Sequence, residues 1–248
     1  MARRHRNLAS LVRPWLFAIT GLLLLAHLAV HGVNHLTPVQ PEVLRFFDAK
    51  GELNIVSWWN AALLLAFGAL AGLAALAATG RRERVAFTLM ALTGAFLSLD
   101  ETATIHEYYG RIFGIDLGTL TFSWVLSGLI LTVVGSTVLV LAGRALPRLL
   151  QRRLLVALGI YVTGVLLVEA VTGVILSRWR TRLVWVEETL QPVLVAVEEA
   201  LEITGAALAV LAVLAHLQAR GTIVLPPSRG AAGQAEGARL SGTGRPGG

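Results

Sequence analysis

Histidines and carboxylates interrupt the apolar stretches of this sequence. His27 and His31 are four residues apart, a spacing that places two side chains on one face of a helix. Imidazole and carboxylate groups together are typical ligands of zinc, iron and manganese. The sequence therefore predicts a divalent metal site. Its candidate ligands come from four apolar stretches and are His27, His31, Asp100, Glu101, His106, Glu107, Glu169, Glu198, Glu199 and Glu202.

The carboxylates have a spacing of their own. On a helix, Glu198 and Glu202 are neighbours one turn apart, and Glu199 also lies beside Glu202. Asp100 and Glu107 share a face because seven residues make almost two turns. Carboxylates this close repel one another unless a cation or a proton lies between them. The spacing favours a shared site for a cation or for protons, and it assigns no catalytic residue.

The elements that position these side chains are apolar enough to cross a membrane. The 248 residues are 55% hydrophobic and have a mean hydropathy of +0.70, which is too apolar for a soluble domain of this length. One crossing needs about 20 apolar residues. We predict an all-α integral membrane protein, a bundle of six transmembrane helices. The predicted spans are 15–36, 53–79, 85–107, 119–142, 154–177 and 191–217.

The predicted membrane domain, residues 15–217, lies between two polar segments. Residues 1–14 form a basic N-terminus that resembles a signal peptide, but the apolar run after it is too long, so we expect an uncleaved first helix. Residues 218–248 are rich in glycine, alanine, arginine, serine and proline. Such a tail buries too little apolar surface to fold, and we expect it to be disordered and cytoplasmic.

The charge of +6 follows the predicted topology. The N-terminus, alternate loops and the tail hold 15 of the 21 basic residues. By the positive-inside rule, both termini are cytoplasmic and the protein lies in the cytoplasmic (inner) membrane. We therefore expect membrane lipids as partners, with a candidate substrate in the outer leaflet or on the periplasmic side, and no nucleic acid. The pattern sets no oligomeric state.

The predicted ligands fall in one layer of the membrane. Glu169 is 16 residues after Arg153, about 24 Å up a hydrocarbon core of about 30 Å. Glu202 lies at nearly the same height, and Asp100 and Glu101 follow an apolar run too short to span. The histidines of the first helix climb through the same depth. Because ionisable groups inside a bilayer are costly and usually functional, we expect one shared site in the outer half.

Three segments resemble a known family: ELNIVSWWNAALLL at 52–65, FLSLDETATIHE at 96–107 and VEEALEITG at 197–205. They are similar to uncharacterised bacterial multi-pass membrane proteins with an SLDE…IHE motif and a later EExxE motif. The resemblance covers roughly residues 45–216 and brings no assigned reaction. It implies that the following residues belong together: Asp100, Glu101, His106, Glu107, Glu198, Glu199 and Glu202.

These observations leave several functions open. The leading interpretation is a divalent metal site that supports chemistry on a lipid-like or periplasmic-side substrate. The alternatives are a transporter or channel coupled to protons or cations, and a non-catalytic scaffold subunit. The inner halves of the predicted helices are almost wholly alanine, leucine, valine and glycine, which disfavours conduction by one chain. The chain has no cysteine and no nucleotide or haem signature.

Overall fold

The computed structural model describes residues 8–51, 53–105, 125–179 and 186–224, and these residues form helices without any strand. Two π-helical turns occur, η1 (Thr163–Val168) between α7 and α8, and η2 (Val186–Leu190) before α9. The α-helices are α1 (Leu8–Leu36), α2 (Pro41–Phe47), α3 (Ile55–Ala77), α4 (Arg81–Ala103), α6 (Val125–Gly143), α7 (Arg148–Val162), α8 (Glu169–Trp179) and α9 (Gln191–Ala219).

Within the described residues, five helical segments are long and apolar enough to cross a membrane: Leu8–Leu36, Ile55–Ala77, Arg81–Ala103, Arg148–Ile175 and Glu188–Ala219. They correspond to five of the six predicted spans. The remaining predicted span, 119–142, contains α6, whose apolar part Gly128–Gly143 is shorter. Residues 119–124 of that span lie outside the described residues, as do 1–7 and 225–248 of the predicted terminal segments.

Two helix boundaries differ from the predicted ones. Helix α1 is described from Leu8, before the predicted boundary at residue 15, and the Ala9 amide donates to the Gln218 side chain of α9. Helix α4 ends at Ala103, before the predicted end at residue 107. There Thr104 adopts a left-handed conformation, with φ 54°, which ends the helical backbone.

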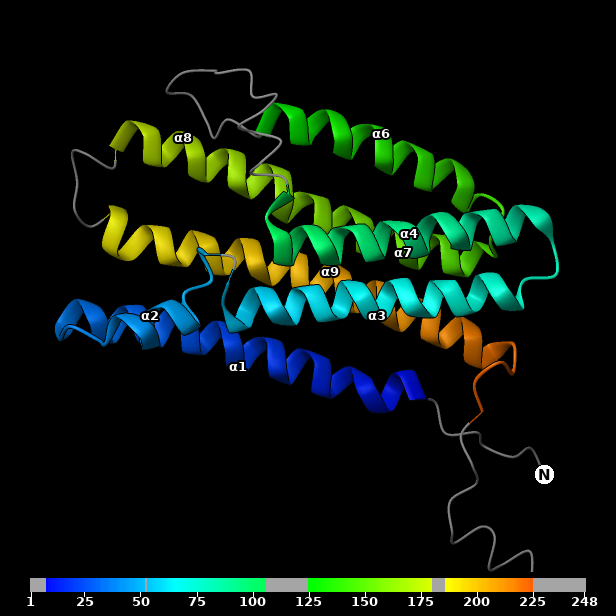
Figure 1. The fold of residues 1–248 in the computed structure, drawn as a ribbon, viewed down its shortest axis with the longest axis horizontal. Helices are drawn as coiled ribbons and strands as arrows, with labels where there is room; N and C mark the ends of the chain where they lie inside the picture. The colour runs from blue at the N-terminus through cyan, green and yellow to red at the C-terminus, as the bar shows by residue number, and fades with distance from the viewer. Residues whose placement is uncertain (1–7, 52, 106–124, 180–185, 225–248) are drawn as a thin grey trace, which may run out of the picture.

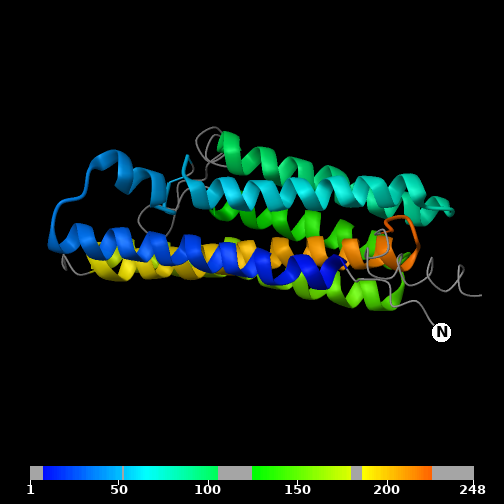
Figure 2. The ribbon, with the colours of Figure 1, turned by 90° about the horizontal axis from the view of Figure 1, so that it is seen from below.

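The long helices run alternately up and down (Figure 1). The Ala9 amide donates to Gln218 Oε1 at 3.2 Å, so the first turn of α1 lies beside the last turns of α9. Turns 78–80 and 144–147 lie at the same end of the bundle. At the opposite end, the histidine end, α1 carries His27, His31 and His35 and α2 turns back along it (Figure 2). We call the first end the basic end because it carries Arg13, Arg81, Arg82, Arg84, Arg144, Arg148, Arg152, Arg153 and Arg220.

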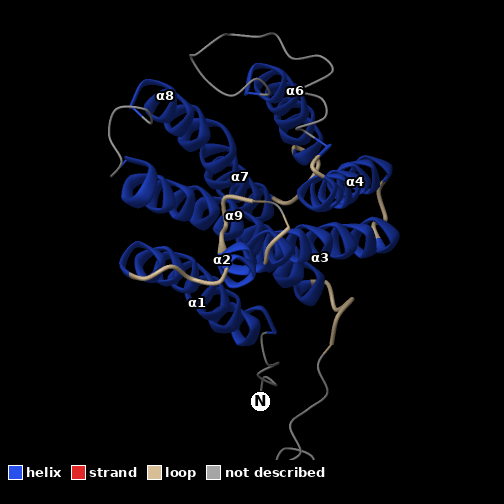
Figure 3. Ribbon diagram, turned by 60° about the vertical axis from the view of Figure 1, so that its left-hand side comes forward, coloured by secondary structure: helices blue, strands red, loops and turns tan. Residues whose placement is uncertain are grey.

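Helix α9 is central and packs against α1, α3 and α7 (Figure 3). Glycines allow the closest approaches. A Cβ added at Gly205 of α9 would lie 2.7 Å from Tyr161 Cβ of α7, and one at Gly94 of α4 would lie 2.8 Å from Gly68 Cα of α3. Gly68 belongs to the Gly-x-x-x-Gly spacing of α3, so this small-residue face packs inside the bundle.

The half of the bundle nearest the basic end has an apolar interior. Phe87, Val213 and Leu217 are fully buried there. Met90 and Leu150 pack against them from α4 and α7. This apolar layer lies between the basic end and the polar side chains farther along the same helices.

Candidate metal centre

Two helices bring together a group of histidine and aspartate side chains at the histidine end. His27 and His31 lie one turn apart on α1, and their ring centroids are 4.8 Å apart. Asp48 is the residue that ends α2, and its extended backbone turns the chain away from the helix. Because α2 folds back along α1, the Asp48 carboxylate faces both imidazoles.

The three side chains approach one another closely. His31 Nε2 lies 3.0 Å from Asp48 Oδ1, and His27 Nδ1 lies 3.8 Å from the same oxygen. One ligand atom from each of the three residues lies within 4.8 Å of the other two. Among the described residues, no other set of three histidine or carboxylate side chains meets this closely.

The hydrogen bonds of His27 select one tautomer. Its Nδ1 accepts from the Ala49 amide at 3.1 Å, so Nδ1 carries no proton. Its Nε2 therefore carries the proton and donates to the Pro192 carbonyl of α9 at 3.0 Å. Metal-binding histidines commonly donate their second ring N–H to a backbone carbonyl in this way. The lone pair of Nδ1 accepts the hydrogen bond of the Ala49 amide and lies on the Asp48 side of the ring.

Asp48 is held as an anion. Burial alone would raise the pKa of the Asp48 carboxyl, but the hydrogen bond from His31, the Lys50 amide and the nearby imidazoles outweigh it, so this pKa lies below its usual value. The Lys50 amide donates to Oδ1 at 3.1 Å. A carboxylate that stays ionised beside two imidazoles is the form that binds metal ions.

Two of the distances between these ligand atoms are close to those found around a metal ion. Two ligands of a tetrahedral zinc lie about 3.4 Å apart, because each is about 2.0–2.1 Å from the ion. The distances of 3.0 and 3.8 Å from Asp48 Oδ1 lie on either side of this value. A cavity of about 150 Å³, lined by His31, Asp48 and Gln191 among others, lies beside the group. His27, His31 and Asp48 could therefore hold a metal ion.

The predicted carboxylates gather elsewhere, around Asn60 of α3 and Tyr161 of α7. Asn60 is fully buried and its Nδ2 donates to Glu202 Oε2 at 3.3 Å. Glu101 of α4 and Glu198 of α9 interact electrostatically, so the two helices bring their carboxylates together. We call Asp100, Glu101, Glu198, Glu199 and Glu202 the carboxylate cluster. Its members within electrostatic range of the Tyr161 hydroxyl are Asp100, Glu101, Glu199 and Glu202.

The structure separates the histidine pair from Glu202, although we expected them to share one site. His27 is bonded to Pro192, and Glu202 is ten residues farther along α9, which is about 15 Å. Metal–ligand bonds are only about 2 Å long. One ion held by His27 and His31 therefore cannot also bind Glu202. Three predicted ligands are not placed relative to either group: His106 and Glu107 lie outside the described residues, as does the side chain of Glu169.

Residues 16–217 match the family described as Domain of unknown function (DUF8692). The chain belongs to this family. No curated protein and no solved structure matches the chain. The DUF8692 match spans every helix of the described bundle except the first turns of α1 and the last turn of α9, and it is consistent with the resemblance to an uncharacterised family.

Three residues of this DUF8692 chain were missed by the sequence reasoning. Asp48 lies outside the predicted spans, and no spacing relates it to the histidines of α1. Asn60 interrupts the apolar run WWNAALLL, and a polar side chain there was a signal that we left unused. Tyr161 is one of several aromatic residues in apolar helices, and only the packing of α7 on α9 distinguishes it.

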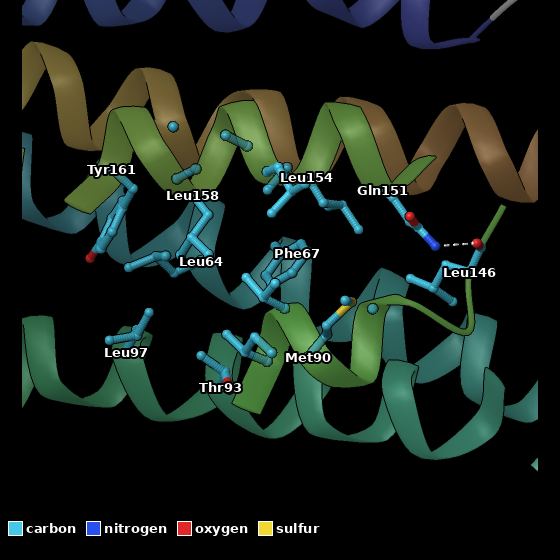
Figure 4. Close-up of a pocket in the computed structure, with 18 of the residues that line it drawn as sticks. Leu64, Phe67, Met90, Thr93, Leu97, Leu146, Gln151, Leu154, Leu158 and Tyr161 are labelled. Carbon is cyan, nitrogen blue, oxygen red and sulfur yellow. Dashed lines mark hydrogen bonds between the residues drawn. The ribbon is translucent and has the colours of Figure 1, made fainter. Parts of the chain in front are cut away.

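A second, larger cavity lies between α3, α4, α6, α7 and α9 (Figure 4). Its volume is about 350 Å³, and its walls are mostly apolar, with several leucines beside Phe67 and Met90. Figure 4 places Tyr161 at one end and Gln151 at the other. Tyr161 thus belongs both to the wall of this apolar cavity and to the surroundings of the carboxylate cluster.

Proposed function

We propose that this chain is a multi-pass membrane protein that binds a divalent metal ion through His27, His31 and Asp48. The observation that carries the proposal is the convergence of two imidazoles and one ionised carboxylate within 4.8 Å. Two histidines and a carboxylate are a recurrent ligand set for catalytic zinc and for non-haem iron. Manganese also accepts this mixed set of donors.

The ligand set favours a centre that supports chemistry over a purely structural one. Structural zinc sites use four protein ligands, whereas catalytic sites keep a position open for water or substrate. Here the described residues offer three ligands, with the cavity beside His31 and Asp48 next to them. A metal bound there would supply an activated water or a Lewis acid. We propose a lipid-like or periplasmic-side substrate, because the site lies toward one end of the bundle.

The proposed membrane placement follows from charge. We infer six spans with both termini in the cytoplasm, in the inner membrane, with α6 as the sixth span. The gathering of arginines at the basic end supports this orientation, because basic residues favour the cytoplasmic side. The histidine end would then face outward. Labelling of single-cysteine variants tests this orientation. The chain has no cysteine of its own that would react.

The test is the metal content of detergent-purified protein, measured by mass spectrometry beside two histidine variants. We expect about one equivalent of zinc, iron or manganese in the natural protein and its loss in His31→Ala. His35→Ala is the matched control, because His35 lies one turn farther along α1 and pairs with Glu188 at 3.1 Å instead. Metal absent from the natural protein after both aerobic and anaerobic purification would refute the proposal, as would equal loss in both variants.

A second candidate function is transport coupled to protons or cations. The observation in its favour is the carboxylate cluster, which places ionisable groups inside apolar helices beside Asn60 and Tyr161. The buried apolar side chains of Phe87, Val213 and Leu217 oppose it, because apolar packing in that half of the bundle disfavours the passage of ions. Proton or cation flux into proteoliposomes that is abolished by Glu202→Gln would reverse this ranking.

A further inference from the structure

The apolar cavity between α3, α4, α6, α7 and α9 has dimensions that suit one apolar chain. Its volume of about 350 Å³ lies within the range of small-molecule pockets. Gln151 and Tyr161 line its two ends and are ten residues apart on α7, which corresponds to about 15 Å. Half of a bilayer core of about 30 Å has the same depth. The cavity thus matches one acyl chain of one leaflet in length.

The walls of the cavity exclude a polar occupant from its interior. Leu64, Phe67, Leu97, Leu154 and Leu158 line it between the two ends (Figure 4). Water gains few hydrogen bonds in such an apolar space. An empty cavity of this size would also leave the lining side chains without packing partners. An apolar chain would fill the space and pack against these side chains.

Charge at the basic end identifies the headgroup. Arg144 lines the cavity mouth, is exposed, and has no carboxylate partner in the described part of the chain. Arg148 follows four residues later in the sequence, at the start of α7. Gln151, which also lines this end, already donates its Nε2 to the Leu146 carbonyl at 2.7 Å. The unpaired guanidinium of Arg144 is therefore the group left to bind an anion, and guanidinium groups bind phosphate in two-pronged hydrogen bonds.

We propose that this cavity binds an anionic phospholipid, with its phosphate at Arg144 and one acyl chain extending along α7 toward Tyr161. This proposal rests on the proposed membrane placement but not on the proposed metal site. In that placement, the basic end lies at the cytoplasmic surface, where anionic headgroups attract basic residues. The end of the acyl chain would lie beside Tyr161, next to the carboxylate cluster.

The experiment compares lipid binding to the delipidated protein in detergent, by native mass spectrometry and by thermal unfolding. Phosphatidylglycerol and phosphatidylcholine with identical acyl chains are the probes, and EDTA is present throughout. We expect phosphatidylglycerol to bind more tightly and to raise the unfolding temperature more. Arg144→Gln should reduce this preference by about fivefold, which is the effect of one basic residue near an anionic lipid. Arg81→Gln, an exposed arginine at the same end that does not line the cavity, should keep the preference.

A second pair of variants tests the cavity itself. Leu158→Trp should fill it and abolish tight binding of both lipids, whereas Leu149→Trp, exposed on α7 away from the cavity, should not. If Leu158→Trp fails to fold, the surface substitution Arg144→Gln still decides. Equal binding of the two lipids by the natural protein would overturn the proposal, as would equal losses in Arg144→Gln and Arg81→Gln. His31→Ala should bind lipid normally, so failure of the metal proposal would not be mistaken for failure of this one.

Discussion

Two polar groups inside the same bundle are built in different ways. At the histidine end, His27, His31 and Asp48 turn nitrogen and oxygen donors toward one another within 4.8 Å. The carboxylate cluster instead spreads over α4 and α9 around Tyr161, and Glu202 is bonded to the Asn60 amide. The first arrangement brings unlike donors together, as a metal ion requires. The second embeds several carboxyl groups among closely packed helices.

The difference shows that ionisable residues expected in one layer lie at two different depths of the bundle. Depth is set by position along a helix, and the two groups contact α9 at different positions. Helix α9 contributes to both groups, through the Pro192 carbonyl at one and Glu202 at the other. The ten residues between them keep the groups about 15 Å apart.

The largest effect that we expect is on metal affinity, and it distinguishes the two polar groups. Asp48→Asn keeps the shape of the side chain but removes its charge, and it should weaken metal binding by about 100-fold or more, because even residues behind a ligand matter by about 10–100-fold. Glu202→Gln makes the same chemical change in the carboxylate cluster and should leave the affinity unchanged. Titration with a competing chelator measures both. A loss in Glu202→Gln equal to that in Asp48→Asn would show that the two groups form one site after all.

A smaller effect concerns the packing that holds the carboxylate cluster. Gly205→Ala would place a Cβ 2.7 Å from Tyr161 Cβ and 2.8 Å from the Ala157 carbonyl oxygen, so α7 must move away from α9. Overpacking of this kind costs about 1–3 kcal/mol. Gly159→Ala on α7 is the matched control, since a Cβ there meets nothing within 4 Å. Thermal unfolding in detergent should show a clear loss for Gly205→Ala alone, and equal stability of the two variants would contradict the close packing.

The smallest effect concerns the hydrogen bond between α3 and α9. Asn60→Ala removes the donor at 3.3 Å from Glu202 Oε2 and should cost about 0.6–2 kcal/mol, the range found for hydrogen bonds between membrane helices. Metal content should stay unchanged, because Asn60 does not contact the histidine pair. Unfolding and metal analysis of the same preparation test both statements. If Asn60→Ala lost metal but kept its stability, Asn60 would belong with the histidine pair and not with the carboxylate cluster.

The helical fold could be anticipated from the sequence because long apolar stretches leave the backbone few choices. Backbone groups in lipid must bond within their own segment, so a long apolar stretch forms a helix wherever its packing partners lie. Helices α1, α3, α4 and α9, and the α7–α8 segment, follow this rule. The pairing of His27 with His31 was also predictable, because helical periodicity alone places them on one face.

The third member of the metal group could not be anticipated. Asp48 reaches the histidines only because α2 folds back along α1 and ends with an extended residue. No helical spacing links positions 31 and 48, and the return of the chain depends on contacts between the Ala49 amide, His27 and Pro192. Such contacts join residues far apart in sequence, and composition does not encode them.

The sequence by itself determined that the chain is helical, apolar enough for a membrane and basic at one end, because hydropathy and charge act locally along the chain. It also determined that His27 and His31 share a face. Only the tertiary structure decided which groups meet: Asp48 joins the histidines, whereas Glu202 joins Asn60. The physical reason is that the rotation and register of each helix are fixed by side-chain packing between helices, with glycines such as Gly205 setting the closest approach.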